Sequence, residues 1–135
     1  MVVGKWELGN GRTKGVETMQ SYKELEVYQW AYSQVLEVYA LVKRFPEDER
    51  YGLSSQLKRA ATSIPLNIAE GYGKVETGKE VVRFLSMARG SSAEMEVLLD
   101  LTKDLGYITA EEYSKLKSKQ ESVGRMLTGL IKSLR

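Results

Sequence analysis

The sequence predicts an all-α protein that folds as an antiparallel, up-down-up-down bundle of four helices. Leu, Ala, Glu, Lys and Arg are abundant in a chain with only two prolines, and these residues favour helix. Apolar residues recur at spacings of three and four over four long segments. Short breaks near Pro46, Gly73 and Gly106 separate the segments, which is typical of a bundle whose successive helices are antiparallel neighbours.

The chain divides into a leader, residues 1–19, and a bundle domain, residues 20–135. The leader contains four glycines and no helical period, so we expect it to be flexible. Met19 offers an alternative natural start. In a structured alternative, apolar leader residues dock on a partner as a short arm: Val2, Val3, Trp6 and Leu8.

The first predicted helix spans about Tyr22–Arg44 and ends at Phe45-Pro46, because the residue before proline avoids the helical region. Its expected core seam has the three- and four-residue spacing of a bundle helix. The seam consists of Leu25, Tyr28, Tyr32, Val35, Tyr39 and Val42. The apolar face is widened beyond this seam by Val27, Ala31, Val38 and Leu41, and Trp30 adds a bulky side chain. Core packing is the favoured interpretation of this aromatic pattern; stacking of nucleobases on exposed rings is the alternative.

The second predicted helix begins near Tyr51 or Leu53 and ends at Gly73, with Pro65 bending it from within. Its expected buried stripe contains Leu53, Leu57, Ala61, Ile64, Ile68 and Tyr72. A second, polar stripe starts at Gln56, about 130° around the helix. Its interface residues are Arg59, Ser63, Asn67 and Glu70. We expect these four to face a neighbouring helix or subunit, with Arg59, Asn67 and Glu70 satisfying one another. A solvated flank is the alternative.

The third and fourth predicted helices each begin with a capping box, Thr77 with Glu80 and Thr109 with Glu112. The third helix ends at Gly106. Its apolar positions are Val81, Phe84, Leu85, Ala88, Met95, Leu98, Leu99, Leu101 and Leu105. Those of the fourth helix are Tyr113, Leu116, Val123, Leu127, Leu130 and Leu134, with Gln120 as the one polar member. Residues without bulk are expected to let another helix approach closely: Gly90, Ser91, Ser92, Ala93, Gly124 and Gly129.

Composition argues against an enzyme. The chain has no cysteine and no histidine, which excludes thiol and disulfide chemistry and removes the commonest general base and metal ligand. Five carboxylates are conceivable metal ligands in a bundle: Glu70, Glu94, Glu96, Asp100 and Asp104. The di-iron pattern needs Glu-x-x-His pairs, so we expect no metal, no cofactor and no catalytic site. No apolar run approaches the roughly 20 residues that span a bilayer, and we expect a cytoplasmic protein without membrane contact.

The net charge of +2 is too balanced for an indiscriminate polyanion binder, but it is unevenly distributed. The second and fourth helical segments carry a positive excess. Candidate phosphate-contacting residues are Lys58, Arg59, Lys74, Arg83, Arg89, Lys115, Lys119, Arg125 and Lys132. They would contact the backbone of RNA or DNA without reading bases, because the chain has no groove-reading motif. For the fourth helix, a solvated charged face is the alternative.

Four segments resemble a known family: SYKELEVYQWAY, FPEDERYGLSSQLKRAATSIPLNIAEGYG, RFLSMARGSSAEMEVLLDLTKDLGYI and GRMLTGLIKSL. These are similar to the four-helix-bundle proteins encoded in intervening sequences of bacterial large-subunit rRNA genes. The resemblance covers about residues 21–135. A related branch contains the accessory variability determinants of diversity-generating retroelements, which partner a reverse transcriptase.

The resemblance implies a homopentamer with a barrel shape and a central channel, and a basic surface that engages nucleic acid and a transcriptase. The first hypothesis is therefore a non-catalytic homo-oligomeric accessory protein that binds the RNA or DNA backbone and a reverse transcriptase. The alternative is a protein-interaction scaffold encoded in an rRNA intervening sequence, without direct nucleic-acid contact.

Overall fold

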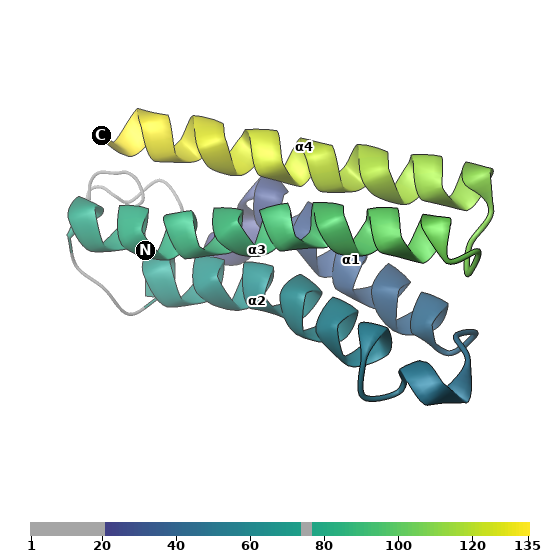
Figure 1. The fold of residues 1–135 in the computed structure, drawn as a ribbon. Coiled ribbons are helices and arrows are strands. Elements are labelled where there is room, and N and C mark those ends of the chain that lie inside the picture. Colours follow the sequence, from purple (N-terminus) through teal and green to yellow (C-terminus); the bar gives the residue numbers. More distant parts are fainter. Residues whose placement is uncertain (1–20, 74–76) are drawn as a thin grey trace.

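The computed structural model describes residues 21–73 and 77–135, and within these ranges the chain is helical without a strand. Its four long helices are α1 (Glu26–Val42), α2 (Leu53–Gly73), α3 (Gly78–Asp104) and α4 (Ala110–Leu134). Two short 3-10 helices accompany them, η1 (Tyr22–Glu24) and η2 (Glu47–Glu49). Successive long helices run in opposite directions (Figure 1), as a four-helix bundle requires. The all-helical prediction is confirmed, while the predicted leader lies outside the described residues.

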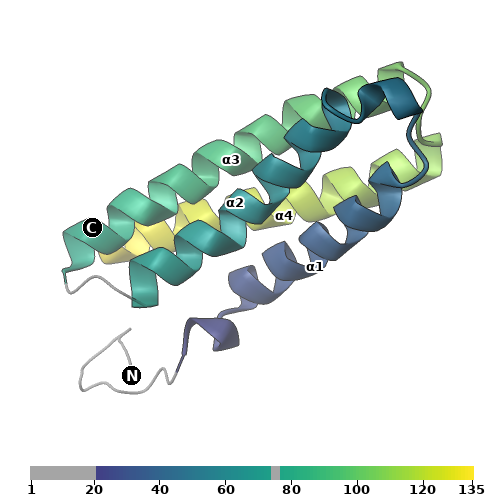
Figure 2. The same cartoon turned by 90° about the horizontal axis from the view of Figure 1, so that it is seen from below.

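The helices occupy the corners of the bundle in chain order. Contact is most extensive between α2 and α3, followed by α3 with α4 and α1 with α2, and it is least extensive between α1 and α4. No contact joins α1 to α3 among the described residues, so these two helices lie on a diagonal. Figure 2 shows α2 and α4 between them.

The core is centred on α2, whose predicted buried stripe is largely confirmed. Leu57, Ile64 and Ile68 are fully buried, and Tyr72 at the end of the stripe is half-buried. Facing them from the other helices are Leu85, Met95, Leu99, Leu127 and Ile131. Pro65 is buried inside α2, which continues through it. The ribbon of α2 bends along its length in Figure 1, as expected for an internal proline.

The start of α2 is fixed by Glu49, in a way that the sequence pattern did not show. One carboxylate oxygen of Glu49 accepts from the Leu53 backbone N–H at 3.1 Å, and the other accepts from the Tyr107 hydroxyl at 2.8 Å. The Tyr107 ring also packs against Phe45, with ring centroids 5.2 Å apart. The α1–α2 and α3–α4 connections are therefore joined at one end of the bundle.

The predicted seam of the first helix is confirmed only in part, because Leu25, Tyr28, Val35 and Val42 are half-buried and pack against the core, whereas its other two residues are exposed. The residues that α1 buries are Val27, Ala31, Gln34, Val38 and Leu41. Tyr32 and Tyr39, which were expected in the core, are 53% and 44% exposed. The helix carries two apolar stripes, and the one with smaller side chains faces its neighbours because it permits closer packing. The predicted helix is also interrupted at Leu25, whose backbone is extended between η1 and α1.

Two apolar stripes remain uncovered on the surface of the described residues. The α1 stripe consists of Tyr32, Leu36 and Tyr39, spaced by four and three residues. The α3 stripe consists of Val97, Leu101 and Leu105, spaced by four. Leu101 and Leu105 were expected in the core, but they are exposed because the bundle buries a neighbouring face of α3 that contains Leu98 and Thr102. Leu134 of α4 is likewise exposed, and Ile131 is buried.

The predicted helix starts are confirmed at Thr109 and only half confirmed at Thr77. Thr109 and Glu112 form both hydrogen bonds of a capping box, at 3.1 and 2.9 Å. Thr77 accepts from the Glu80 backbone N–H, but the Glu80 carboxylate binds Arg83 at 3.0 Å and does not return to the cap. The charged Arg83 guanidinium, one turn along the helix, competes successfully with the Thr77 backbone N–H for this carboxylate.

Of the three glycines at which a close approach was predicted, only Gly124 lies against a neighbouring helix. A side-chain carbon at Gly90 or Gly129 would meet nothing within 4 Å, because both positions face outward. At Gly71 it would lie 3.1 Å from the Phe84 side chain, so α2 and α3 are in close contact at this glycine. At Gly124 it would lie 3.4 Å from Ser92 Oγ.

Candidate functional site

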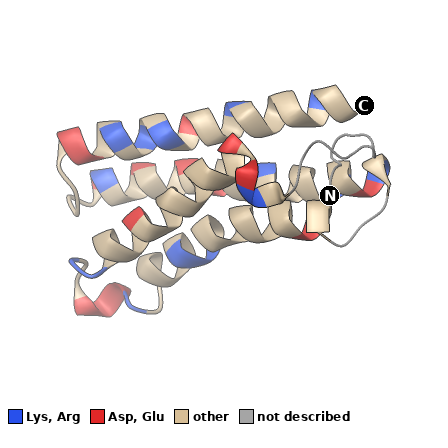
Figure 3. Cartoon of the chain, turned by 180° about the vertical axis from the view of Figure 1, so that it is seen from behind, with Lys and Arg blue, Asp and Glu red and all other residues tan. Residues whose placement is uncertain are grey.

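The predicted phosphate-contacting residues do not form one patch. Arg83 pairs with Glu80 at 3.0 Å, and Lys119 donates to Glu37 at 2.9 Å and to Ser33 at 2.8 Å. These two cations are therefore already neutralised by carboxylates. Lys74 lies outside the described residues. Figure 3 shows acidic bands among the basic ones in the first half of α4, and basic bands alone toward its end.

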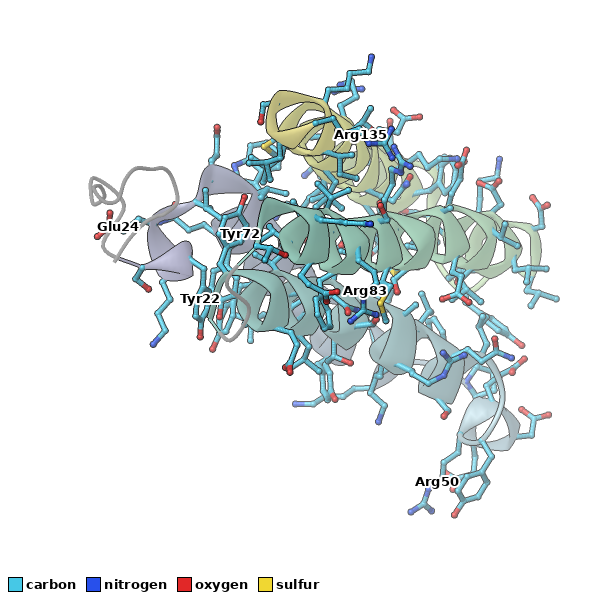
Figure 4. All side chains as sticks on the ribbon, turned by 90° about the vertical axis from the view of Figure 1, so that its left-hand side faces the viewer. Tyr22, Glu24, Arg50, Tyr72, Arg83 and Arg135 are labelled. Carbon is cyan, nitrogen blue, oxygen red and sulfur yellow. The ribbon has the colours of Figure 1, made fainter. Side chains whose placement is uncertain are left out.

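Three further candidates lie in separate grooves. Lys58 lies at the α1–α2 corner with its ammonium 5.3 Å from the centroid of the Tyr39 ring. Lys115 lines a groove between α1 and α4, and Arg59 lines one along α2. Arg50, which the sequence pattern did not single out, also lines the α1–α2 corner and extends away from the helices in Figure 4. The α1–α2 corner and the α1–α4 groove each hold three cations, but carboxylates already pair with some of them: Arg50 with Glu47 at 3.8 Å, Arg44 with Glu112 at 2.9 Å and Lys119 with Glu37 at 2.9 Å.

The remaining three candidates, Arg89, Arg125 and Lys132, converge on one groove between α3 and α4. It has a volume of about 650 Å³. We call it the α3–α4 groove, lined by Arg89, Ser92, Ala93, Glu96, Gln120, Glu121, Gly124, Arg125, Thr128, Gly129 and Lys132. None of its three cations forms an ion pair within the described residues; Arg125 donates only to the neighbouring Ser122 hydroxyl at 3.2 Å. Glu96 and Glu121 also line the groove, so its formal charge is positive by one unit.

Small residues keep the α3–α4 groove open. The lining positions of α3 are spaced by three and four residues, and Ala93 adds only a methyl group. On α4, Gly124 and Gly129 add no side chain to the wall. Arg89 and Lys132 have long side chains that keep their charged ends in water. The result is an open groove between small residues, bordered by charged side chains of both signs.

The floor of the groove contains polar atoms without partners. Gln120 Nε2 donates to the Ser92 carbonyl oxygen at 3.0 Å. Gln120 Oε1 and Ser92 Oγ are buried and have no partner among the described residues. A buried polar atom without a hydrogen bond is destabilising by about 1–3 kcal/mol, so such atoms call for an explanation. The sequence pattern placed Gln120 in the core seam of the fourth helix, but it did not indicate that this residue lies beneath a groove.

A neighbouring polar cluster at the start of α4 is internally satisfied. Asp100 accepts from the Tyr113 hydroxyl at 2.6 Å and from Lys117 Nζ at 2.9 Å. These hydrogen bonds, with that from Tyr113 contributing most, hold the pKa of Asp100 below its usual value. The hydroxyl of Tyr113 and the carboxylate of Asp100 raise the pKa of Lys117. This cluster joins α3 to α4 beside the groove.

The carboxylates considered as metal ligands do not gather. Among the described residues, no three or more Asp or Glu side chains are placed so that they could hold a metal ion. Asp100 is engaged with Tyr113 and Lys117, while Glu96 lines the α3–α4 groove. In the same part of the chain, no helix has both the length and the apolarity that a membrane crossing requires.

The predicted interface residues of α2 lie beside α3. Ser63 Oγ is 2.8 Å from Ser91 Oγ, and the Asn67 amide donates to the Ser63 carbonyl and hydroxyl at 2.9 and 3.1 Å. Asn67 was expected to hydrogen-bond with Arg59, but its amide binds Ser63, which lies one helical turn before it. Arg59 and Glu70 line the outer edge, a groove of about 350 Å³. The stripe thus serves partly as a contact within the chain.

Comparisons with known proteins agree with this architecture. The family model described as 23S rRNA-intervening sequence protein matches residues 23–129, which include every residue of the α3–α4 groove except Lys132. A solved structure from Bacteroides thetaiotaomicron, a protein of unknown function from the S23 ribosomal protein family, is 25% identical in sequence, with a TM-score of 0.72. The alignment covers 78% of this chain and 98% of that one. No curated protein matches the chain.

Proposed function

The chain belongs to the 23S rRNA-intervening sequence protein family, and from this premise we propose that it is a non-catalytic accessory protein that binds the nucleic-acid backbone and self-assembles. One observation carries the binding proposal. Arg89, Arg125 and Lys132 come from two helices to one groove and have no carboxylate partners among the described residues. Phosphates would supply the missing negative charge.

The chemistry of this proposal is electrostatic. Arg89 and Arg125 offer planar guanidinium donors that suit phosphate oxygens, and Lys132 adds a mobile point charge. Phosphate contacts position a protein on a nucleic acid without selecting a sequence. Binding should therefore weaken with salt, with a slope in log affinity of about −0.7 per contact on single strands and −0.9 on duplex DNA.

Salt titration of affinity tests the proposal. We expect a fluorescent 20-nucleotide RNA to bind at low salt, and Arg125→Gln or Lys132→Gln to reduce the salt slope by about one contact. Arg50→Gln is the matched control, because it removes the same charge from the far end of the bundle. No binding at low salt, or equal effects of all three substitutions, would exclude the groove as the binding surface.

Self-assembly would use the two uncovered stripes. The α1 stripe and the α3 stripe lie on diagonal helices that do not touch. A contact between the α1 stripe of one copy and the α3 stripe of the next would be heterologous, and such contacts close into rings when the rotation permits. The family resemblance suggests a ring of five. We propose that Arg59 and Glu70, which line the outer edge of α2, also take part in this interface.

Light scattering tests the assembly. We expect an oligomer at micromolar concentration, reduced to a monomer by Leu36→Glu or by Leu101→Glu, because each places a charge in an apolar contact. Tyr51→Glu is the control, since Tyr51 is 85% exposed and lies outside both stripes. A wild-type monomer, or an oligomer that tolerates both stripe substitutions, would refute the ring.

Two finer points rest on the resemblance alone. A relationship to the retroelement accessory proteins implies a reverse transcriptase as a partner, and a cytoplasmic location would suit such a role. A transcriptase gene beside this one would support the partnership. The second candidate function, a scaffold without nucleic-acid contact, is favoured by the uncovered stripes, and it becomes the better explanation if the protein assembles but binds no RNA.

A further inference from the structure

The α3–α4 groove has features that phosphate binding alone does not need. It contains two carboxylates, Glu96 and Glu121, which would repel a bare phosphate backbone. It is also open between its helices where small residues line it, and beneath it lie buried polar atoms without partners. A ligand with both a negatively charged part and a flat, hydrogen-bonding part fits these features better than phosphate does.

Resting on the proposed function, we propose that the groove accepts the base of one unpaired nucleotide in a single-stranded segment, while Arg89, Arg125 and Lys132 contact the flanking phosphates. The bases of a duplex are stacked and paired, so their edges and faces are not free to enter such a groove. Single strands and loops can turn a base outward, and proteins that recognise them use this freedom.

The walls of the groove suit a flat ring. Gly124 and Gly129 leave the α4 wall without side chains, and Ala93 faces them from α3 with a single methyl group. At Gly129 an added carbon would meet nothing within 4 Å, so the space above this residue is open. A volume of about 650 Å³ accommodates a nucleotide unit, since ligand sites commonly measure about 300–1,000 Å³.

The polar groups suit the edge of a base. Ser92 is 2% exposed and Gln120 is 5% exposed, yet Ser92 Oγ and Gln120 Oε1 have no partner among the described residues. The Ser92 hydroxyl lies across from Gly124, on the groove side of α3. A base edge offers both donors and acceptors, and Glu96 or Glu121 can accept from an exocyclic amino group as carboxylates do in base recognition.

Three ligands of equal length separate the base from the phosphates. The probes are a 20-nucleotide single-stranded RNA of mixed sequence, its blunt duplex, and an abasic strand with the same number of phosphates. We expect the RNA strand to bind about tenfold more tightly than the abasic strand, the effect of one hydrogen bond to a buried group. Equal affinity for these two strands would overturn base insertion.

Filling the groove tests its location. Gly129→Leu adds a side chain to the wall and keeps all three cations, and leucine favours helix, so the fold is preserved. Gly78→Leu is the matched control, because its side chain would also meet nothing within 4 Å but lies at the start of α3, outside the groove. Circular dichroism confirms the folding of both variants.

The outcomes distinguish this inference from the proposed function. We expect Gly129→Leu to lower affinity for the RNA strand to that of the abasic strand, with duplex and abasic affinities unchanged and Gly78→Leu without effect. If all three ligands bind equally and with salt dependence, phosphate binding stands and base insertion is wrong. If none binds at low salt, both are wrong. Equal losses for every ligand in Gly129→Leu would also refute base insertion.

Discussion

Replacing Gln34 by methionine should stabilise the protein. Gln34 lies on the buried face of α1 and is 1% exposed. Neither Nε2 nor Oε1 of its amide has a partner among the described residues. Methionine has a similar unbranched shape, so Gln34→Met removes two unsatisfied polar groups while retaining most of the packing.

The magnitude follows from burial. An unsatisfied buried polar group is destabilising by about 1–3 kcal/mol, and replacing it with an apolar group of the same shape removes that penalty. Part of the gain is offset by imperfect packing of the new side chain, at about 1 kcal/mol. For the two amide atoms we expect a net increase of about 2 kcal/mol in the free energy of unfolding. In a domain of this size that corresponds to about 8 °C in Tm.

Urea denaturation at pH 7, followed by circular dichroism at one protein concentration, measures the effect. The control is Gln29→Met, because Gln29 is exposed and its amide donates to the Lys23 carbonyl at 3.1 Å. We expect no gain in the control. A loss of stability in Gln34→Met would refute the reasoning, since it would show that the amide atoms have partners, such as internal water, that outweigh their burial.

Three further predictions concern the helix ends. Glu49→Ala should lower the free energy of unfolding by about 1 kcal/mol in urea denaturation, because it removes the cap of α2, whereas exposed Asp48→Ala should not. Gly106→Ala should be destabilising by about 1–2 kcal/mol in the same assay, because the backbone φ of +79° is unfavourable for residues with a side chain. The Arg44 hydrogen bond, and then the Thr109 backbone, lower the pKa of Glu112 from its usual 4.5 to about 2. A lowered pKa stabilises the fold above pH 4.5, so Glu112→Gln should be less stable than wild type at pH 7, and this difference should vanish between pH 4.5 and 2. A constant difference down to pH 2 would contradict this assignment.

Elements with one dominant apolar stripe could be predicted from the sequence, and elements with two could not. The buried stripe of α2 has a single solution, because polar residues such as Gln56 and Asn67 occupy the flanks of Ile64 and Ile68. In α1 the pattern around Tyr32 and that around Ala31 both follow the helix period. Only the fit of side chains against α2 and α4 chooses between them, and periodicity contains no information about that fit.

The groove could be predicted in composition but not in position. Arg89, Arg125 and Lys132 stand out as basic residues, yet nothing local distinguishes them from Arg83 or Lys119. Arg83 pairs with Glu80 one turn away, and Lys119 pairs with Glu37 on another helix. Whether such ion pairs form depends on how each helix is rotated about its axis. Gly129 was expected to permit a helix contact because a glycine at close approach and a glycine at an open wall look alike in sequence.

The weak attachment of α1 has a consequence for the order of folding. Helices α2, α3 and α4 are consecutive and share the most extensive contacts, so they can assemble through pairings that are short in sequence. Docking of α1 onto α4 instead closes a loop of some eighty residues, as the Lys119–Glu37 ion pair illustrates. Because loop closure is unfavourable in entropy, we expect α1 to join last. Its backbone amides should accordingly exchange hydrogen first, and a transient three-helix state should expose the side chains that α1 covers.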